Sequence, residues 1–579
     1  MSDNFIVEKS KDGYDILKVK IDDKWKYIGS SYNQKREIDK FIDNFGCLTE
    51  NDNYIILGLS LGEHIRELLK VCNKDSHLFV IEPNEELVKT LQKENKIDDI
   101  LENDKVTVCT TNEEIKKILP TFINETNVDF LKLGVYSNYI KLYDKLVYYY
   151  KTVKEYVQRI LLYRNTSLVN SNIWFNTLMG NLNEIVKSTP LNILENQYKN
   201  KPAIIVSAGP SLSKNIDYLK EIDGRALILS GGRTLRPLVE KNIEPDCLVV
   251  VDPGKVSYDL VKDYIGNVKC PLLFYDGTNS NVVNSFIGKN IISTHNKFIH
   301  KIFNKEIENI NKGGSVAHSM TYFAAYMGCN PIIFIGQDLA YTDEKSHADI
   351  ALNKYKFTTF EDYKSDDDLY VKDIEGRDVR TSIVLNSFKI ELEDIIKSFP
   401  EIEFIDSTEG GAYIEGTKIK TLKEVIESLD NNKVEVLDKF LDTEIDKSKE
   451  AIVQLENSLK LMKQCKGNCS EGITLLRKYR NAYMLKNIVN MNNINKLLGK
   501  IDKNLKNQID ELQFLESVLF DVIYKINSDI QFVVLEDDSE KAKIEKQLSK
   551  NRTIYEEINK TLDRCIPKVQ QTLESLKNN

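Results

Sequence analysis

The sequence predicts an α/β protein with a central Rossmann-like parallel sheet domain, preceded by a smaller α/β domain and followed by an all-helical domain. Three observations predict this class. Short apolar runs that end in glycine or polar clusters dominate the first two thirds of the chain, heptad-spaced apolar residues dominate the last third, and glycine and proline are scarce, at 26 and 12 of 579 residues. At about 150 residues per domain, this length indicates roughly three to four domains. We expect an α/β domain at 1–140, a helical linker at 141–200, a central domain at 201–415 and a helical domain at 416–579.

Composition disfavours several classes of protein. A formal net charge of −9 lacks the basic footprint of a nucleic-acid binder, so we expect no nucleic-acid partner. The chain contains no run of about 18 apolar residues, so we expect no membrane span. The first residues are polar and acidic, unlike a secretory signal. The nine cysteines are scattered and odd in number, which favours reduced thiols and a cytoplasmic location.

The first domain contains one strand–helix–strand unit. The apolar run Tyr54–Leu57 leads into a turn with Gly58 and Gly62, then a helix, and then the run Leu78–Ile81, which ends at Glu82. This order is typical of a right-handed parallel unit and is similar to the cofactor-binding opening of a methyltransferase, where the acid holds a ribose. The alternative is a scaffold sheet whose acid caps a helix. Apolar residues at three- and four-residue spacing then predict helix from about 139 to 200.

Seven apolar runs recur in the central domain, and each stops at a polar or glycine cluster. They are Ala203–Val206, Ala226–Leu229, Leu248–Val251, Leu272–Tyr275, Ile291–Ile292, Ile332–Ile335 and Ile402–Ile405. Continuous runs of this kind between helices indicate a parallel sheet covered on both faces. Ligands of such sheets bind beyond the carboxyl ends of the strands, so the clusters that follow the runs predict a ligand site there.

Two glycine turns in this domain suit a phosphate. Ser207-Ala208-Gly209-Pro210-Ser211 leads from a strand into a helix, and Lys312-Gly313-Gly314-Ser315 opens a second helix. Exposed amides at a helix start attract anions. Neither turn is a dinucleotide fingerprint or a P-loop, which disfavours a hydride cofactor and P-loop ATP chemistry.

A third motif, Gly336-Gln337-Asp338-Leu339-Ala340-Tyr341, follows a predicted central strand, and His347 comes shortly after it. A histidine near a carboxylate can act as a general base near neutral pH. The alternative is that Asp338 caps a turn and His347 is a solvated loop residue. Asp366-Asp367-Asp368 looks superficially like a metal-holding motif, but no strand precedes it, so we interpret it as a loop and expect no metal site.

The last third of the chain has a heptad seam. Its members are Leu441, Ile445, Ser448, Ile452, Leu455, Leu459 and Met462. Further helical patterns cover 473–491, 494–526 and 554–576. We expect a helical bundle that binds a partner or self-associates, and self-association through these helices would give a homo-oligomer. The alternative is that the helices form a structural cap on the central domain.

Five motifs together resemble the motility-associated factor (Maf) flagellin glycosyltransferases, whose central domain is similar to bacterial sialyltransferases. They are Ser207–Leu212, Glu244-Pro245-Asp246 with Asp252-Pro253, Gly313–Ala317, Gly336–Tyr341 and Glu409–Ala412. The resemblance implies transfer of a nonulosonic acid of the pseudaminic or legionaminic type from its CMP-activated form to Ser/Thr hydroxyls of flagellin, as flagellum assembly and motility require. It implies flagellin and the CMP-sugar as partners, and no required cofactor.

The resemblance also suggests roles for residues. Asp338, Tyr341 and His347 are the predicted catalytic residues: Tyr341 would lie over the leaving phosphate, and His347 or Asp338 would take the proton from the acceptor in an inverting attack. The predicted donor-binding residues are Ser207, Gly209, Pro210, Ser211, Gly231, Gly232, Arg233, Asp252, Thr294, Gly313, Gly314, Ser315 and Gln337. Among them, Arg233 is the candidate for the sugar carboxylate. Ala208 stands where the sialyltransferases have an asparagine.

Two other functions remain open. Archaeal 6-hydroxymethylpterin pyrophosphokinases resemble this central domain, but they are shorter and use ATP with magnesium. A non-catalytic flagellin-binding chaperone, with the helical tail as its binding surface, is the other alternative. Release of CMP or AMP separates the two enzymes, and the mass of flagellin from cells without the protein tests the chaperone.

Overall fold

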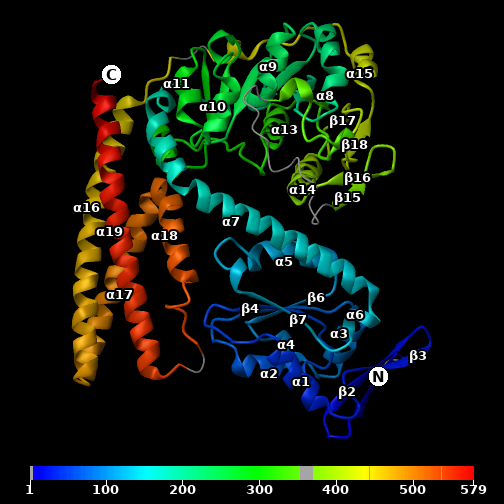
Figure 1. The fold of residues 1–579 in the computed structure, drawn as a ribbon, viewed down its shortest axis with the longest axis vertical. Coiled ribbons are helices and arrows are strands. Elements are labelled where there is room, and N and C mark those ends of the chain that lie inside the picture. Colours follow the sequence, from blue (N-terminus) through cyan, green and yellow to red (C-terminus); the bar gives the residue numbers. More distant parts are fainter. Residues whose placement is uncertain (1–3, 353–368, 442–443, 536–537, 579) are drawn as a thin grey trace. The chain divides into compact units, whose positions relative to one another are not determined.

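The structure is a computed structural model that describes residues 4–352, 369–441, 444–535 and 538–578 (Figure 1). The chain divides into two compact units. The first comprises Met1–Val169, Ile473–Ile494 and Phe520–Glu557, and the second comprises Asn170–Gly472, Asn495–Leu519 and Ile558–Asn579. The predicted fold class is confirmed: a parallel-sheet α/β region is preceded by a smaller α/β region and followed by helices. No helix in the described part of the chain is long and apolar enough to cross a membrane.

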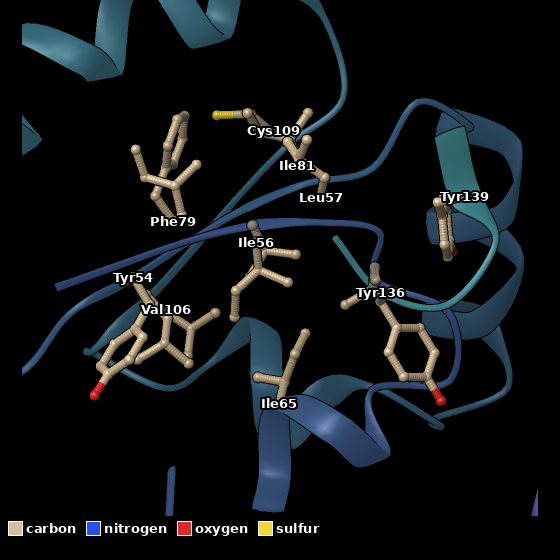
Figure 2. Close-up of a cluster of buried hydrophobic side chains, with 14 of the residues drawn as sticks. Tyr54, Ile56, Leu57, Ile65, Phe79, Ile81, Val106, Cys109, Tyr136 and Tyr139 are labelled. Carbon is tan, nitrogen blue, oxygen red and sulfur yellow. The ribbon is translucent and has the colours of Figure 1, made fainter. Parts of the chain in front are cut away.

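The first unit contains two sheets. An antiparallel sheet of β1 (Phe5–Lys9), β2 (Asp15–Ile21) and β3 (Lys24–Ile28) was not predicted from the sequence. The predicted parallel unit forms a four-stranded sheet of order β6-β5-β4-β7. Its strands are β4 (Asn53–Leu57), β5 (Leu78–Ile81), β6 (Val106–Cys109) and β7 (Leu131–Val135). The helices around it are α1 (Gln34–Asp43), α2 (Glu63–Val71), α3 (Glu85–Lys93), α4 (Asp98–Leu101), α5 (Asn112–Phe122) and α6 (Tyr139–Leu142). Figure 2 shows the buried side chains that hold β4, β5 and β6 together.

The second unit is built on a nine-stranded sheet of order β18-β17-β14-β9-β10-β11-β12-β13-β8, in which each pair of neighbours is parallel. The strands are β8 (Thr189–Pro190), β9 (Ala203–Val206), β10 (Leu227–Gly231), β11 (Cys247–Val250), β12 (Leu272–Tyr275), β13 (Asn290–Ser293), β14 (Ile332–Ile335), β17 (Phe404–Asp406) and β18 (Thr417–Ile419). Each of the seven predicted runs forms one of these strands. A hairpin of β15 (Leu369–Lys372) and β16 (Asp378–Thr381) lies outside this sheet.

Both faces of the sheet are buried, as its apolar strands require. Successive residues of β9 enter different cores: Ala203 and Ile205 belong to the core that includes α13 (Val316–Tyr326), while Ile204 and Val206 belong to the core that includes α15 (Leu422–Ser428). The other helices of this region are α8 (Leu212–Asn215), α9 (Gly232–Glu240), α10 (Lys255–Val261), α11 (Ser280–Ser285), α12 (Lys297–Phe303) and α14 (Ile383–Ser398). Because both faces of the sheet are covered, a ligand can reach the strands only at their ends.

In the described chain, five long helices supply most of the remaining helical residues of the two units. They are α7 (Asp144–Ile185), α16 (Ser448–Met484), α17 (Ile488–Glu511), α18 (Glu516–Ser528) and α19 (Glu540–Asn578). The predicted seam begins too early, because α16 starts at Ser448. Its members Leu455 and Met462 are buried as predicted, and Ala451, which was not predicted, is buried with them. The predicted run 473–491 crosses the break between α16 and α17.

Candidate functional site

Four neighbouring strands bring most of the predicted site residues to one edge of the large sheet. In the order of the sheet, these strands are β17, β14, β9 and β10. Because they are parallel, the segments at their carboxyl ends share that edge: Gly336–Tyr341 after β14, Ser207–Ser211 after β9, Gly231–Arg233 at β10, and Ser407–Gly411 after β17. Open α/β sheets bind their ligands at this edge.

Asp338 ties two of these segments together. Its carboxylate accepts hydrogen bonds from the hydroxyl (2.7 Å) and the amide (3.3 Å) of Ser211, and from the hydroxyl of Thr342 (2.6 Å). Asp338 is buried, and this burial raises its pKa, while the donors from Thr342 and Ser211 oppose the rise. A Cβ atom on Gly209 would collide with this carboxylate, so only glycine fits there. Asp338 thus acts as a clamp between the turn after β9 and the turn after β14.

The backbone around this clamp is unusually constrained. Leu339 has a φ of 52° and Glu409 a φ of 60°, in the left-handed region that side-chain-bearing residues rarely adopt. The amide of Ala412 donates to the carbonyl of Asp338 (2.7 Å), and a Cβ on Gly411 would collide with the same carbonyl. Strained backbone that clusters in one place is typical of functional sites.

The Gly209 and Ser211 amides of the Ser207–Ser211 turn already have acceptors inside the chain. The amide of Gly209 donates to the carbonyl of Gly336 (2.8 Å), and that of Leu212 donates to the carbonyl of Gly209 (3.0 Å). Ser211 donates to Asp338, and proline has no amide hydrogen. The Ser207 hydroxyl donates to the Gln337 side chain. These contacts join the turn to the segment after β14, and the Ser211 amide could bind a phosphate only if Asp338 released it.

Tyr341, the predicted contact of the leaving phosphate, is buried beneath an arginine that the sequence did not single out. The Arg380 guanidinium carbon lies 3.8 Å from the centre of the Tyr341 ring. The Tyr341 amide donates to the Arg380 carbonyl (2.9 Å), and Arg380 donates to Glu344 (3.2 Å). Arg380 stands in the short hairpin strand β16, which has no recognisable motif.

His347 is held beside the turn after β9. The amide of Ala348 donates to the carbonyl of Ala208 (3.0 Å), and His347 Nδ1 pairs with the Ser346 hydroxyl (3.0 Å). Arg236 of α9 donates to the carbonyl of Ile350 (2.7 Å), which anchors the segment on its other side. His347 is half-buried.

The second glycine turn is closed by a buried acid. The amide of Gly314 donates to the Glu391 carboxylate (2.8 Å), and that of Ser315 donates to Nδ1 of His318 (3.2 Å). Since Nδ1 accepts, Nε2 carries the hydrogen that bonds the carbonyl of Phe388 (2.8 Å). Burial lowers the pKa of His318, which keeps the ring neutral. The sequence analysis places His318 in the helix that Lys312–Ser315 opens, and it does not single out Glu391.

Gly231–Arg233 is the corner with the clearest capacity for an anion. Gly231 caps α9 without any side-chain hydrogen bond to the first-turn amides, and these amides carry the positive end of the helix dipole. Desolvation raises the pKa of Asp252, and the Arg233 charge opposes this rise. A Cβ on Gly231 would lie 3.0 Å from Val316, which puts this corner in contact with the start of α13.

Thr294 lies apart from these corners. It follows β13, three strands beyond β10. Its hydroxyl donates to Asp276 (2.9 Å) and accepts from the amide of Asn296 (2.9 Å). These hydrogen bonds connect it with residues near the ends of β12 and β13, not with Asp338 or Arg233.

In the first unit, a tyrosine fills the predicted cofactor turn. A Cβ on Gly58 would collide with the Tyr139 ring, whose hydroxyl donates to Glu82 (2.7 Å) and accepts from the amide of Ser60 (2.6 Å). Glu82 also accepts from the amide of Leu59 (2.9 Å), and burial raises its pKa to about 7. This arrangement favours the scaffold interpretation, although Asn84 rather than Glu82 caps α3.

Metal ligands do not cluster in the described residues: no group of three or more His, Cys, Asp or Glu side chains has the arrangement to hold an ion. Asp366-Asp367-Asp368 lie outside the described residues.

Comparisons with known proteins agree with the motifs. Residues 176–344 match the family model of the 6-hydroxymethylpterin diphosphokinase MptE-like proteins. The solved structure of a Maf glycosyltransferase from Magnetospirillum magneticum AMB-1 is similar over 100% of this chain and 93% of that chain, with a TM-score of 0.57 and 14% identity. No curated protein matches the sequence significantly. The resemblance to Maf glycosyltransferases that the motifs predicted is therefore confirmed, at the level of the fold and over the whole chain.

Proposed function

We propose that the chain is an inverting glycosyltransferase that moves a nonulosonic acid from its CMP-activated form to Ser/Thr hydroxyls of flagellin. The observation that carries this proposal is the assembly, at one sheet edge, of an uncapped helix start with Arg233 and a clamped segment with Tyr341 and His347. The motifs and the fold shared with a Maf glycosyltransferase indicate the class of reaction. The proposal places the reaction in the cytoplasm, before flagellum assembly, and includes no metal or other cofactor.

The donor carries two anions, a phosphate and a sugar carboxylate. The first-turn amides of α9 and the Arg233 guanidinium suit such groups, because they combine the helix dipole with a fixed positive charge. The amides of Gly209, Ser211, Gly314 and Ser315 already have acceptors within the chain, so in this proposal their two turns shape the edge rather than bind the phosphate directly. This assignment shifts the donor site toward Gly231–Arg233.

The acceptor hydroxyl needs a base, and His347 suits this role better than Asp338. Three hydrogen bonds from Ser211 and Thr342 occupy the Asp338 carboxylate, which would have to release them before taking a proton. His347 is half-buried beside the same turn. In the proposed step, His347 takes the acceptor proton, the acceptor oxygen bonds the anomeric carbon, and CMP leaves from the opposite face with the electron pair. Tyr341, with Arg380 stacked on it, would donate to the departing phosphate.

The test is a reaction of the purified chain with flagellin and a CMP-nonulosonic acid. Intact-mass spectrometry should show flagellin heavier by one or more sugar residues, with one CMP released per transfer. Unchanged flagellin with every available CMP-nonulosonic acid would contradict the proposal. Unchanged flagellin mass in cells that lack the protein would instead favour a chaperone.

A pterin diphosphokinase is the second candidate, because the MptE-like model matches residues 176–344. That reaction would transfer a diphosphate from ATP to 6-hydroxymethylpterin and release AMP. Incubation of the chain with ATP, magnesium and the pterin decides between the two functions. Release of AMP, together with no turnover of a CMP-sugar, would favour the diphosphokinase over the glycosyltransferase.

A further inference from the structure

The turn between α16 and α17 exposes a compact apolar surface. Met484 and Leu485 at the end of α16, and Ile488 and Val489 at the start of α17, are between 66% and 79% exposed. We call these four residues the apolar tip. Elsewhere in the described chain, large exposed apolar side chains are mostly isolated in sequence, as Ile287 and Ile530 are. Two pairs of such side chains on either side of one turn indicate an interaction surface.

The tip is an ordered turn. Lys486 adopts the left-handed conformation common at helix ends, and its amide donates to the carbonyl of Tyr483 (3.0 Å). The Asn487 amide donates to the carbonyl of Ala482 (2.9 Å), and the Asn487 side chain accepts from the amide of Asn490 (3.0 Å). The helices thus hold four apolar side chains toward solvent in a fixed place, where α16 meets α17 (Figure 1).

The segment that carries the tip has charged side chains of one sign only. Residues 473–500 contain no Asp or Glu, although the whole chain has a net charge of −9. Their basic residues are Arg477, Lys478, Arg480, Lys486, Lys496 and Lys500. Arg480 forms an ion pair with Glu545 (3.0 Å), and Arg477, Lys478 and Lys486 are also exposed. The tip is therefore an apolar surface within a positively charged segment.

We propose that the apolar tip docks on an anionic lipid surface, with its four apolar side chains in the headgroup region and the flanking Lys and Arg residues against the lipid phosphates. A basic amphipathic surface with apolar residues at its end has the chemistry of peripheral membrane binding. The positive charge disfavours a tip-to-tip pairing of two copies, because like charges repel. An acidic helix of a partner protein is the competing occupant, and the test below separates it.

The experiment is co-sedimentation of the full chain with vesicles of phosphatidylglycerol and phosphatidylcholine, and with vesicles of phosphatidylcholine alone. We expect binding to the anionic vesicles, weak binding to the neutral ones, and release at about 0.5 M salt, where the charges are screened. The double variant Leu485→Ser/Val489→Ser and the double variant Lys478→Glu/Lys486→Glu should each weaken binding about ten-fold or more. Ile530→Ser, equally exposed outside the tip, is the matched control and should bind as the unchanged chain does.

The outcomes are distinct. No binding of the unchanged chain to anionic vesicles would overturn the proposal and favour a protein partner. Binding that the tip variants leave intact would overturn it as well. So would a loss of self-association in the tip variants without vesicle binding, which would favour a second copy. All substituted side chains are exposed, so we expect every variant to keep the fold. Circular dichroism of each variant checks this.

Discussion

Asp338 accepts hydrogen bonds from both the hydroxyl and the amide of Ser211, a residue 127 positions earlier in the chain. Two neighbouring strands of the large sheet are joined through this contact at their carboxyl ends. The same type of contact recurs at the other glycine turns: Glu391 closes the turn at Gly314, and Glu82 closes the turn of the first unit. In this chain, buried carboxylates take the amides that an external anion would use in a phosphate-binding turn.

Removal of the Asp338 carboxylate should destabilise the second unit. In Asp338→Ala, the buried donors of Ser211 and Thr342 lose their acceptor, so we expect the free energy of unfolding to fall by about 2–5 kcal/mol. Urea unfolding followed by circular dichroism measures this. Asp343→Asn, at an exposed position nearby, should change stability by less than about 0.5 kcal/mol. Equal effects of both variants would contradict the clamp.

Arg233 should control donor binding. Arg233→Ala removes the charge that we propose contacts the CMP phosphate, so we expect CMP affinity to fall about ten-fold or more, as for a charge-assisted hydrogen bond worth about 1.5–3 kcal/mol. Titration calorimetry with CMP measures it. Arg377→Ala, an exposed arginine of the β15–β16 hairpin, is the control and should bind CMP normally. Unaltered CMP affinity in Arg233→Ala would place the donor elsewhere.

His347 should affect turnover more than binding. His347→Ala removes the proposed base, so kcat should fall about 10²- to 10⁴-fold while the affinity for CMP stays within about two-fold. Single-turnover transfer to flagellin, followed by mass spectrometry, provides the rate. His77→Ala, an exposed histidine of the first unit, should retain full activity. An unchanged rate in His347→Ala would show that another group takes the proton.

Glu82 should make the stability of the first unit depend on pH. Burial raises its folded-state pKa from 4.5 to about 7, so the folded state holds a proton that the unfolded state has released. Its contribution is therefore complete below about pH 4.5 and is lost as pH rises through about 7, a loss of about 3 kcal/mol. Hydrogen exchange of peptides from β4 and β5 measures this stability, with exchange times scaled for the effect of pH on the intrinsic exchange rate. Between about pH 4.5 and 7, the free energy of unfolding should fall more steeply with pH in the unchanged chain than in Glu82→Gln. Identical pH slopes in the two proteins would contradict the prediction.

The strands of the large sheet could be predicted because each is a short apolar run with a polar end, a local signal that burial on both faces requires. Gly209, Gly314 and Gly336 were likewise visible as turns. Arg380, Glu391 and His318 were not, since their importance comes from contacts formed only after folding. The Gly314–Glu391 contact joins residues 77 positions apart, and no local pattern marks such a pair.

The antiparallel strands β1–β3 and the break after Met484 were missed for a different reason. The strands of the first sheet mix apolar and charged residues, as in the sequence of β2, and so lack the continuous apolar signal. The break between α16 and α17 has neither glycine nor proline, and the apolar tip residues continue the helical pattern through it. In the structure these residues are exposed rather than buried. A periodic pattern cannot distinguish those two cases.

A crystal structure of the full chain with CMP tests the central claim most directly. The account predicts the CMP phosphate at the first-turn amides of α9 and the Arg233 guanidinium, with Tyr341 and His347 facing the same ligand at the carboxyl edge of β9, β10 and β14. CMP bound away from that edge, or absent at saturating concentration, would contradict it.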